Sequence, residues 1–392
     1  MNVVTVVGIG AEGWDGLTAV AQRALREAEV LLGSARQLDL VPAEVAARRV
    51  VWPSPMMPAV PGLLETYRDR GLCVLASGDP MFYGIGSRLG PTRVITHPSS
   101  VSLACARLGW AVQDTEVISA VGRPIELLNA AVHPGRRLIV LSANGETPGQ
   151  VAELLTKRGY GASLMTVLAQ LGDAAENKVT ATAEQWQGPS DALNVIAIEC
   201  HGSKLLPNVP GLPDEAYESD GQLTKREVRA ITLSRLAPVP GQLLWDVGGG
   251  AGSIAIEWAR THPSCRAITV ERDPTRAARI TRNAAELGVP RIQVVESAAP
   301  VDGLETPDAI FIGGGLTAPG MVEWAWEALR PGGRLVVNAV TVESEAVMAR
   351  WHARLGGDLV RISVTRGSPV GGFTGWRPLM PVTIWTVNKE SL

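Results

Sequence analysis

The stretch LLWDVGGGAGSIAIEWA, residues 243–259, joins two apolar segments through a glycine-rich turn. The pattern predicts a buried strand, a tight turn and a helix in direct succession. Glycine in such a turn allows positive φ angles and lets a ligand approach the backbone without a Cβ in the way. The turn glycines are Gly248, Gly249, Gly250 and Gly252. The stretch therefore predicts a ligand-binding loop at the carboxyl end of a strand in an α/β fold.

Two acidic residues indicate which ligand class suits this loop. Glu271 ends the next predicted strand, and acids near this spacing bind ribose hydroxyls. Asp246 ends the first strand, where it would repel a dinucleotide pyrophosphate but attract the cationic ammonium and sulfonium groups of S-adenosylmethionine. In addition, Ser253 stands where a dinucleotide loop has its third glycine. Methyl transfer is therefore favoured over hydride transfer, and a purely structural glycine turn is the other alternative.

Strand and helix patterns alternate along the whole chain. We expect, for example, a strand over 3–7, a helix over 17–29 and a strand over 334–339. Strands separated by helices of this length indicate parallel sheets with helices on both faces. Because the two halves share no obvious repeat, the sequence predicts two different α/β units.

The clearest shift in composition is GSKLLPNVPGLPDEAYESDGQ, residues 202–222. Prolines recur there at every third position, at Pro207, Pro210 and Pro213. Proline at this density favours an extended, semi-rigid spacer. We therefore expect one domain over 1–204, a proline-rich linker over 205–221 and a second domain over 222–392.

The composition indicates a folded protein without a strong charge preference. Hydrophobic residues make up 46% and charged residues 19%, and the net charge is −3, so neither disorder nor a generic nucleic-acid binder is expected. Of the 36 basic residues 31 are arginine, which suits a substrate with several carboxylates, although a GC-rich genome gives the same bias. No run approaches the roughly 18 apolar residues of a membrane helix, and the opening MNVVTVVGIG lacks the features of a signal peptide. The sequence predicts a cytoplasmic protein with no membrane or nucleic-acid partner.

Metal and disulfide chemistry find no support in the residue spacing. The four cysteines form no C-x-x-C pair, and the five histidines show no metal-ligand spacing. We therefore expect no metal site.

Several motifs after the linker occur in a known order. DVGGGAGSIAIEWA (246–259) is followed by VERDP, ESAAP, PDAIFIGGG and RPGGRLVVNAV, as in class I S-adenosylmethionine-dependent methyltransferases, which this half resembles. LTKREVRAITLSRL (223–236) is similar to the subfamily that methylates precorrins at C15 with decarboxylation. The resemblance implies a Rossmann-like fold.

The same resemblance implies roles for residues of the second half. The loop from Gly248 to Gly252 would line the methionine end of the cofactor, and Glu271 would hold the ribose. Ser297 and Ala298 would flank the adenine, and Thr224 would close the pocket. Family members often carry G-D-A where this chain has Glu-Ser-Ala at 296–298.

Three motifs mark the first half. VVGIGAEGWDGLT (6–18) reads as a strand, a glycine turn and a helix entry. LASGDPMFYGIG (75–86) places Gly78, Asp79 and Pro80 directly after a strand. HPSSVSLACARLG (97–109) places Ser99 and Ser100 at a helix start, where their hydroxyls either cap the helix or bind a ligand.

Together these motifs resemble the tetrapyrrole methylase family over roughly residues 1 to 200. The resemblance implies that the cofactor binds near Gly78, Asp79 and Pro80, with 81–84, Ser99 and Ser100 beside it, and that the loop 8–13 faces the tetrapyrrole. The usual V-G-x-G-P-G is altered, since Ala11 and Glu12 replace proline and glycine. That change recurs in the branch that methylates C5.

The two resemblances imply one bifunctional chain. It would bind one S-adenosylmethionine per domain and methylate a late precorrin at C5 and C15, with decarboxylation of the ring-C acetate, in cobalamin biosynthesis. A homo-oligomer is expected. The alternatives are a non-catalytic module that binds S-adenosylmethionine or a tetrapyrrole, and an NAD-dependent dehydrogenase.

The sequence offers two candidate residues for proton transfer. Asn338 and Glu343 follow a predicted strand at the end where α/β proteins bind ligands, so both are catalytic candidates. Glu343 is equally suited to the start of a helix. The segment SPVGGFTGWRP (368–378) suits either a substrate lid or an ordinary loop.

Overall fold

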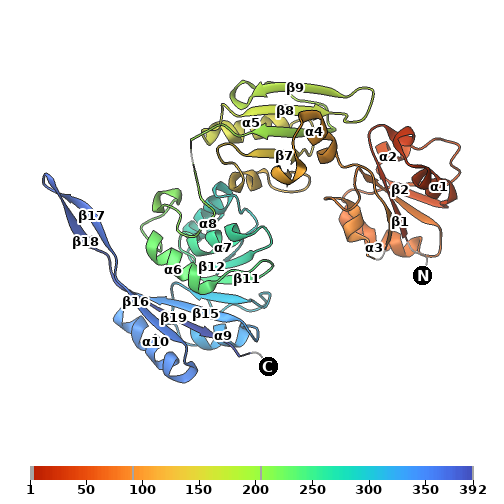
Figure 1. Ribbon diagram of the computed structural model, residues 1–392. Helices are drawn as coiled ribbons and strands as arrows, with labels where there is room; N and C mark the ends of the chain where they lie inside the picture. The colour runs from red at the N-terminus through yellow and green to blue at the C-terminus, as the bar shows by residue number, and fades with distance from the viewer. Residues whose placement is uncertain (1–3, 91, 204, 391–392) are drawn as a thin grey trace. The chain divides into compact units, whose positions relative to one another are not determined.

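The computed structural model describes residues 4–90, 92–203 and 205–390, and the chain divides into two compact units (Figure 1). Unit 1 comprises residues 1–125 and 132–204, and unit 2 comprises 126–131 and 205–392. Val3, which the sequence assigns to the first strand, lies outside the described residues.

The first sheet of unit 1 is parallel, with the strand order β3-β2-β4-β1-β5. Its strands are β1 (Val4–Ile9), β2 (Val30–Gly33), β3 (Arg48–Val51), β4 (Leu72–Ser77) and β5 (Thr92–Ile95). Neighbouring residues of β1 face opposite cores, since Val7 packs in a cluster with α1 (Ala19–Glu27) and Val6 in a cluster with α3 (Met56–Thr66). The short helix α2 (Ala35–Asp39) joins the cluster of Val7. The prediction of a parallel sheet covered on both faces is confirmed here.

The second sheet of unit 1 is largely antiparallel, so the prediction of parallel sheets is wrong for this part of the chain. The order is β6-β7-β10-β8-β9, and of these pairs only β6–β7 runs parallel. No α-helix separates the described strands β8, β9 and β10, so antiparallel pairing needs no crossover. The strands are β6 (Glu116–Ser119), β7 (Arg137–Leu141), β8 (Leu164–Ala169), β9 (Asn177–Thr182) and β10 (Asn194–Glu199). The helices are α4 (Ser100–Leu108) and α5 (Thr147–Lys157).

Unit 2 is built on a seven-stranded sheet, with the order β13-β12-β11-β14-β15-β19-β16. The first five strands are parallel, and β19 runs antiparallel to both β15 and β16. The strands are β11 (Leu243–Val247), β12 (Arg266–Glu271), β13 (Gln293–Glu296), β14 (Ala309–Ile312), β15 (Arg334–Ala339), β16 (Asp358–Ile362) and β19 (Val382–Asn388). This is the Rossmann-like arrangement that the family resemblance implies.

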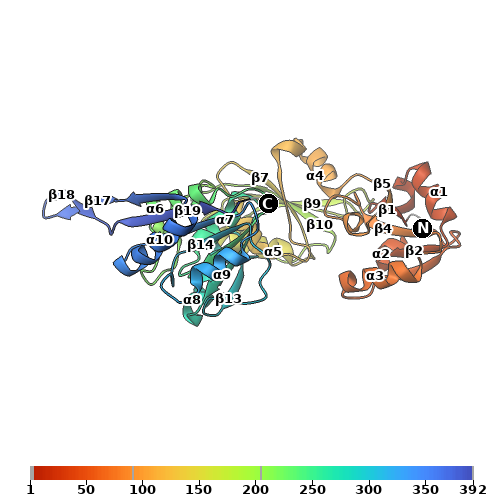
Figure 2. The same cartoon turned by 90° about the horizontal axis from the view of Figure 1, so that it is seen from below.

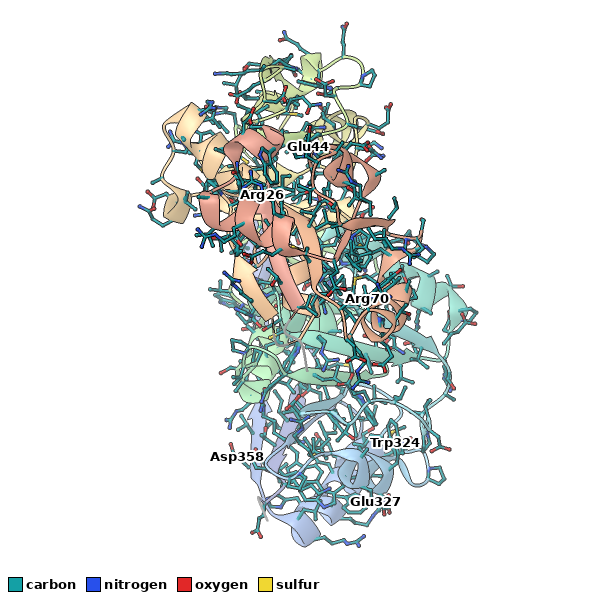
Figure 3. The ribbon with its side chains drawn as sticks, turned by 90° about the vertical axis from the view of Figure 1, so that its right-hand side faces the viewer. Arg26, Glu44, Arg70, Trp324, Glu327 and Asp358 are labelled. Atoms are coloured by element: carbon teal, nitrogen blue, oxygen red, sulfur yellow. The ribbon has the colours of Figure 1, made fainter. Side chains whose placement is uncertain are left out.

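Helices cover both faces of this sheet. Trp245 of β11 packs with α9 (Met321–Ala328) and α10 (Val342–Leu355), whereas its neighbour Leu244 packs with α6 (Arg226–Leu236) and α7 (Ser253–Thr261). Trp324 of α9, labelled in Figure 3, stacks on Trp245 with ring centroids 5.2 Å apart. The helix α8 (Pro274–Glu286) contacts α7, β12 and β13. Alternation along each strand thus builds two cores around one sheet.

The strands β17 (Thr365–Val370) and β18 (Phe373–Pro378) form an antiparallel ribbon that projects from unit 2 (Figures 1 and 2). The glycine-rich segment 368–378 therefore lies in an ordered hairpin, so the alternative of an ordinary loop is wrong, while a role as a substrate lid stays a prediction. Near its base, Arg366 pairs with Asp214 (3.2 Å) and Glu227 (2.5 Å). Phe373 at its outer end is 84% exposed, and Trp376, which lies opposite Gly367 nearer the base, is 80% exposed.

The proline-rich segment 205–221 packs against unit 2 and differs from a free spacer. Leu212 and Tyr217 are buried in a cluster with Ile256 and Leu287. Their burial anchors the segment by the same hydrophobic effect that builds the main cores.

A buried carboxylate adds specific bonds to this packing. Glu257 of α7 accepts hydrogen bonds from Gly211 N (2.6 Å), Leu212 N (3.0 Å) and the Tyr217 hydroxyl (2.9 Å), and it pairs with Arg229 Nε (2.5 Å). Burial raises the pKa of Tyr217 well above its usual value, and the negative charge of Glu257 adds a smaller effect in the same direction. The hydroxyl therefore remains a donor. Segment 205–221 therefore belongs structurally to unit 2.

No helix in the described ranges is long and apolar enough to cross a membrane. Within the same ranges, no group of three or more His, Cys, Asp or Glu side chains is arranged to hold a metal ion.

Candidate active site

A cavity of about 940 Å³ lies in unit 2, where the neighbouring strands β11, β12 and β14 end. Carboxyl ends of parallel strands share one edge of a sheet, which is where α/β proteins bind ligands. Most of the residues that the sequence singled out line the cavity: Thr224, Asp246, Gly248, Gly249, Gly250, Glu271, Ser297, Ala298 and Asn338. Gly252 and Glu343 are not among the lining residues.

The loop glycines serve different purposes. A Cβ on Gly248 would lie 2.8 Å from Gly314 N, and one on Gly252 would lie 2.7 Å from Ile280 Cγ2, so both positions permit close packing within the protein. Gly250 has a φ of +59°, and its Cβ would meet only the Gln222 carbonyl oxygen, at 3.1 Å. Of these three loop glycines, Gly250 is thus the one with the fewest protein atoms around its Cβ position.

Glu271 shapes the loop as well as the cavity wall. Its Oε2 accepts a hydrogen bond from Gly250 N (2.9 Å), and its Oε1 accepts one from Asp273 N (3.0 Å). The side chain is buried, and each carboxylate oxygen keeps further acceptor capacity. A diol placed in the cavity can therefore bond to a carboxylate that the backbone already holds in place.

Asp246 is the most deeply buried charge of the cavity, at 1% exposure. Its Oδ2 accepts a hydrogen bond from Ala255 N (3.2 Å) in α7. Burial raises the pKa of Asp246 to about 7, and the negative charge of Glu271 contributes in the same direction. A cationic ligand group would stabilise the ionised form, so the site is matched to positive charge.

The two catalytic candidates differ in position. Asn338 Nδ2 donates to Thr232 Oγ1 (2.9 Å), and that hydroxyl donates to Val228 O (2.8 Å), so the amide orientation is fixed. The Asn338 Oδ1 is buried without a hydrogen-bond partner. Glu343 lies exposed in the first turn of α10, which agrees with the helix-start alternative, and its catalytic role stays a prediction.

The cavity also contains residues to which the sequence interpretation gave no role. Gly313, Gly314 and Gly315 follow β14 beside the first glycine loop, and the triplet after a predicted strand was the signal for them. Arg272 and Arg276 add positive charge to the wall. Val364, Leu379 and Met380, at the base of the hairpin, also line the cavity, which no local pattern indicated.

In unit 1, the three motifs of the first half come together after β1, β4 and β5. Gly78 N donates to Ile9 O (3.0 Å), and a Cβ on Gly8 would lie 2.2 Å from Gly78 O and 2.8 Å from His97 Cβ. Asp79 Oδ1 accepts a hydrogen bond from Met81 N (2.9 Å), which shapes the turn. The glycine loop 8–13, the G-D-P turn and the entry to α4 thus form one cluster.

The remaining predicted residues of unit 1 surround this cluster. Ser99 is the N-cap of α4, because its Oγ accepts from Ser102 N (3.0 Å), and Ser100 is the first helical residue. Pro80 is buried, whereas the three residues after it are between 39% and 52% exposed: Met81, Phe82 and Tyr83. An apolar, partly aromatic surface therefore follows the G-D-P turn.

Comparison with known proteins matches both units. The family model described as tetrapyrrole (corrin/porphyrin) methylases matches residues 3–187, and the precorrin methyltransferase domain model matches 215–389. A precorrin-6Y C(5,15)-methyltransferase [decarboxylating] from Sinorhizobium sp. is 48% identical over 98% of this chain and 96% of its own length. The protein of the same name from Mycobacterium tuberculosis (strain CDC 1551 / Oshkosh) is 47% identical over 99% of this chain and its full length.

Among solved structures, the C-terminal domain of a precorrin-6Y C5,15-methyltransferase from Rhodobacter capsulatus is similar. It is 42% identical, and the match covers 47% of this chain and 100% of that chain with a TM-score of 0.45.

Proposed function

We propose a division of labour between the two units of this chain, which belongs to the precorrin-6Y C(5,15)-methyltransferase (decarboxylating) family. The chain is a methyltransferase of cobalamin biosynthesis. Unit 1 methylates C5 of a late precorrin. Unit 2 methylates C15 and releases carbon dioxide from the ring-C acetate. Each unit uses one S-adenosylmethionine, and the functional boundary follows residue 204.

The cavity of unit 2 is the observation that carries this proposal. Ligand sites commonly measure about 300 to 1,000 Å³, and the cavity of about 940 Å³ reaches the top of that range. It therefore has room for the cofactor and for part of a large substrate.

The cavity residues fit S-adenosylmethionine, which supplies an electrophilic methyl group when bound. A Cβ on Gly250 would meet only the Gln222 carbonyl oxygen, at 3.1 Å, so few protein atoms surround this side of the loop. Asp246 offers negative charge to the cationic methionine end. We assign Glu271 to the ribose and Ser297 with Ala298 to the adenine. The positive side chains Lys225 and Arg272 are suited to the carboxylates of the tetrapyrrole, whereas Arg276 pairs with Asp220 (2.9 Å).

Residues of unit 1 suit the flat, apolar face of a tetrapyrrole. Phe82 and Tyr83 are half-exposed, meet edge to face at 5.0 Å, and follow the G-D-P turn at Gly78, Asp79 and Pro80. Aromatic rings make favourable stacking contacts with other flat conjugated surfaces. We place the second S-adenosylmethionine beside this turn, with Ser100 at the nearby helix start.

Mass spectrometry of the whole chain with a late precorrin and S-adenosylmethionine tests the assignment. Two methyl gains and one loss of carbon dioxide are expected. An unchanged substrate mass, with the cofactor bound, would favour the non-catalytic binding module.

Replacing Glu271 by Gln should weaken the binding of S-adenosylhomocysteine to unit 2 by about 2 kcal/mol, the scale of hydrogen bonds to a charged group. The amide keeps the shape of the side chain but loses its charge and one acceptor oxygen. Calorimetry on the whole chain measures the change. The matched control is Glu296→Gln, which alters the exposed acid next to Glu271 in the sheet register. Equal affinities of the Glu271→Gln variant and the wild type would remove Glu271 from the ribose site.

The affinity of unit 2 for S-adenosylhomocysteine should rise with pH up to about 7 and then level off. Burial raises the pKa of Asp246 to about 7, so its carboxylate is mostly protonated at pH 6. Below its pKa the ionised fraction falls about tenfold per pH unit, and the attraction for the ligand ammonium falls with it. Titration calorimetry from pH 5 to 8 measures the slope, which should disappear in Asp246→Asn. An identical slope in that variant would assign the pH dependence to another group.

We also propose that the chain forms a homo-oligomer through the hairpin of β17 and β18. Phe373 and Trp376 are exposed on it, and large exposed apolar side chains mark interaction surfaces. Light scattering of the whole chain measures the assembly, and a monomer at all concentrations would exclude it.

A further inference from the structure

An acid and a histidine are paired in unit 1, within the cluster formed by its three motifs. Glu12 lies in the loop after β1, and His97 follows β5. The Glu12 Oε1 and His97 Nε2 atoms are 2.8 Å apart, and the two side chains are 24% and 6% exposed. The pair is thus largely removed from water at the carboxyl edge of the first sheet.

The surroundings of Glu12 are built to hold its side chain. A Cβ on Gly10 would lie 2.0 Å from Glu12 Oε2, one on Gly16 would lie 2.0 Å from Glu12 Cγ, and one on Gly172 would lie 2.8 Å from Oε2. A side chain at any of the three positions would require the Glu12 side chain to move. The glycines therefore leave a space that the Glu12 side chain occupies.

The hydrogen bonds of the pair show how many protons it holds. The His97 Nδ1 is 3.2 Å from the Pro98 carbonyl oxygen, which can only accept, so Nδ1 carries a proton. The contact between Nε2 and Oε1 needs a second proton, because both atoms are otherwise acceptors. Glu12 Oε2 is buried and has no hydrogen-bond partner. One carboxylate oxygen is thus held by His97, and the other is a buried acceptor without a hydrogen-bond partner.

Methylation of a ring carbon requires a group that accepts a proton. The bond between sulfur and the methyl group breaks with its electron pair on sulfur, and a new bond forms to the methyl group from an electron pair of the macrocycle. The methylated macrocycle then carries one additional positive charge, and it becomes neutral again by releasing one proton. A conjugated cation of this kind is a strong acid, so a carboxylate is basic enough to take the proton.

We propose that Glu12 is the catalytic base for C5 methylation and that its carboxylate, 24% exposed as a side chain, accepts the proton released by the macrocycle. His97 is a positioning residue that holds the other carboxylate oxygen and stabilises its negative charge. The inference rests on the assignment of C5 methylation to unit 1. Other acids on the segments packed around Glu12 are Asp15 on the following turn, Asp79 after β4 and Asp173 next to Gly172.

The test compares Glu12→Gln with Glu153→Gln, a control on an exposed acid of α5 that pairs only with Lys157 among the contacts described. Both variants, and the wild type, are supplied with S-adenosylmethionine and a decarboxylated, C15-methylated substrate. In Glu12→Gln, kcat for C5 methylation should fall at least about 100-fold, the usual contribution of a general base, while KM stays within a factor of two. Glu12→Asp should recover part of kcat.

A second readout does not depend on turnover. In the ¹⁵N spectrum of histidine-labelled whole chain, His97 Nε2 should carry a proton in the wild type and lose it in Glu12→Gln, with His97→Gln providing the assignment. If wild type adds no methyl at C5, the proposed function of unit 1 is wrong. If wild type does so and Glu12→Gln matches it, the role of Glu12 is wrong, and an unchanged His97 signal would overturn the proton placement.

Discussion

Gly250→Val should abolish C15 methylation and carbon dioxide release together, while C5 methylation continues. Gly250 has a positive φ that a β-branched residue rarely adopts, and its Cβ side is bounded only by the Gln222 carbonyl at 3.1 Å. An isopropyl group there would occupy the space proposed for the cofactor. We expect a loss of at least about 1,000-fold in C15 methylation, because positioning of the reactants supplies much of the rate.

The experiment separates loss of a site from loss of the fold. Methyl count and carbon dioxide release are measured on a late precorrin, and C5 methylation on a substrate already modified at C15. Gly303→Val is the matched control, since Gly303 also has a positive φ but has open space around its Cβ position.

In unit 1, Asp79→Arg should block C5 methylation and spare decarboxylation. Loss of decarboxylation in a folded Asp79→Arg variant would contradict the assignment of that step to unit 2.

Glu257→Gln should destabilise unit 2 by about 3 to 5 kcal/mol, the usual effect of breaking a buried ion pair. The change leaves the fully buried Arg229 without its closest counter-charge and weakens the anchor of Gly211 and Leu212. Urea unfolding followed by tryptophan fluorescence measures the loss, because Trp258 is buried next to Glu257 in α7.

Two comparisons make this prediction specific. The double variant Glu257→Met with Arg229→Met should lose less stability than the sum of the single changes, because no buried charge is left alone. Arg266→Met breaks an exposed pair with Glu305 (2.6 Å) and should cost no more than about 1 kcal/mol. Equal losses of stability in Arg266→Met and Glu257→Gln would show that burial does not increase the contribution of the Glu257–Arg229 pair to stability.

Local patterns predicted the part of the fold that surrounds the unit 2 cavity. The strand β11, the glycine turn and α7 follow one another in the chain, so their apolar periodicity and glycine spacing are visible in a short window. Asp246 and Glu271 also end strands that are adjacent in the sheet, so chain order alone placed them near the loop.

Features that depend on distant partners were not predicted. The proline spacing of 205–221 suggested a spacer, but the burial of Leu212 and Tyr217 depends on Glu257 in a helix much later in the chain. The second sheet of unit 1 is antiparallel because β10 enters between β7 and β8, a choice that no single strand encodes. Glu12 and His97 lie on different motifs, and only the fold brings them into contact.

The anchoring of segment 205–221 restricts where a gene for this chain can be divided in two. A cut after codon 204 leaves the amides of Gly211 and Leu212 on the same polypeptide as Glu257. A cut at codon 222, where the proline-rich composition ends, gives the second product a buried carboxylate without those donors. Recombination of the two units, in nature or by a protein engineer, therefore preserves the second unit only when the junction precedes the prolines.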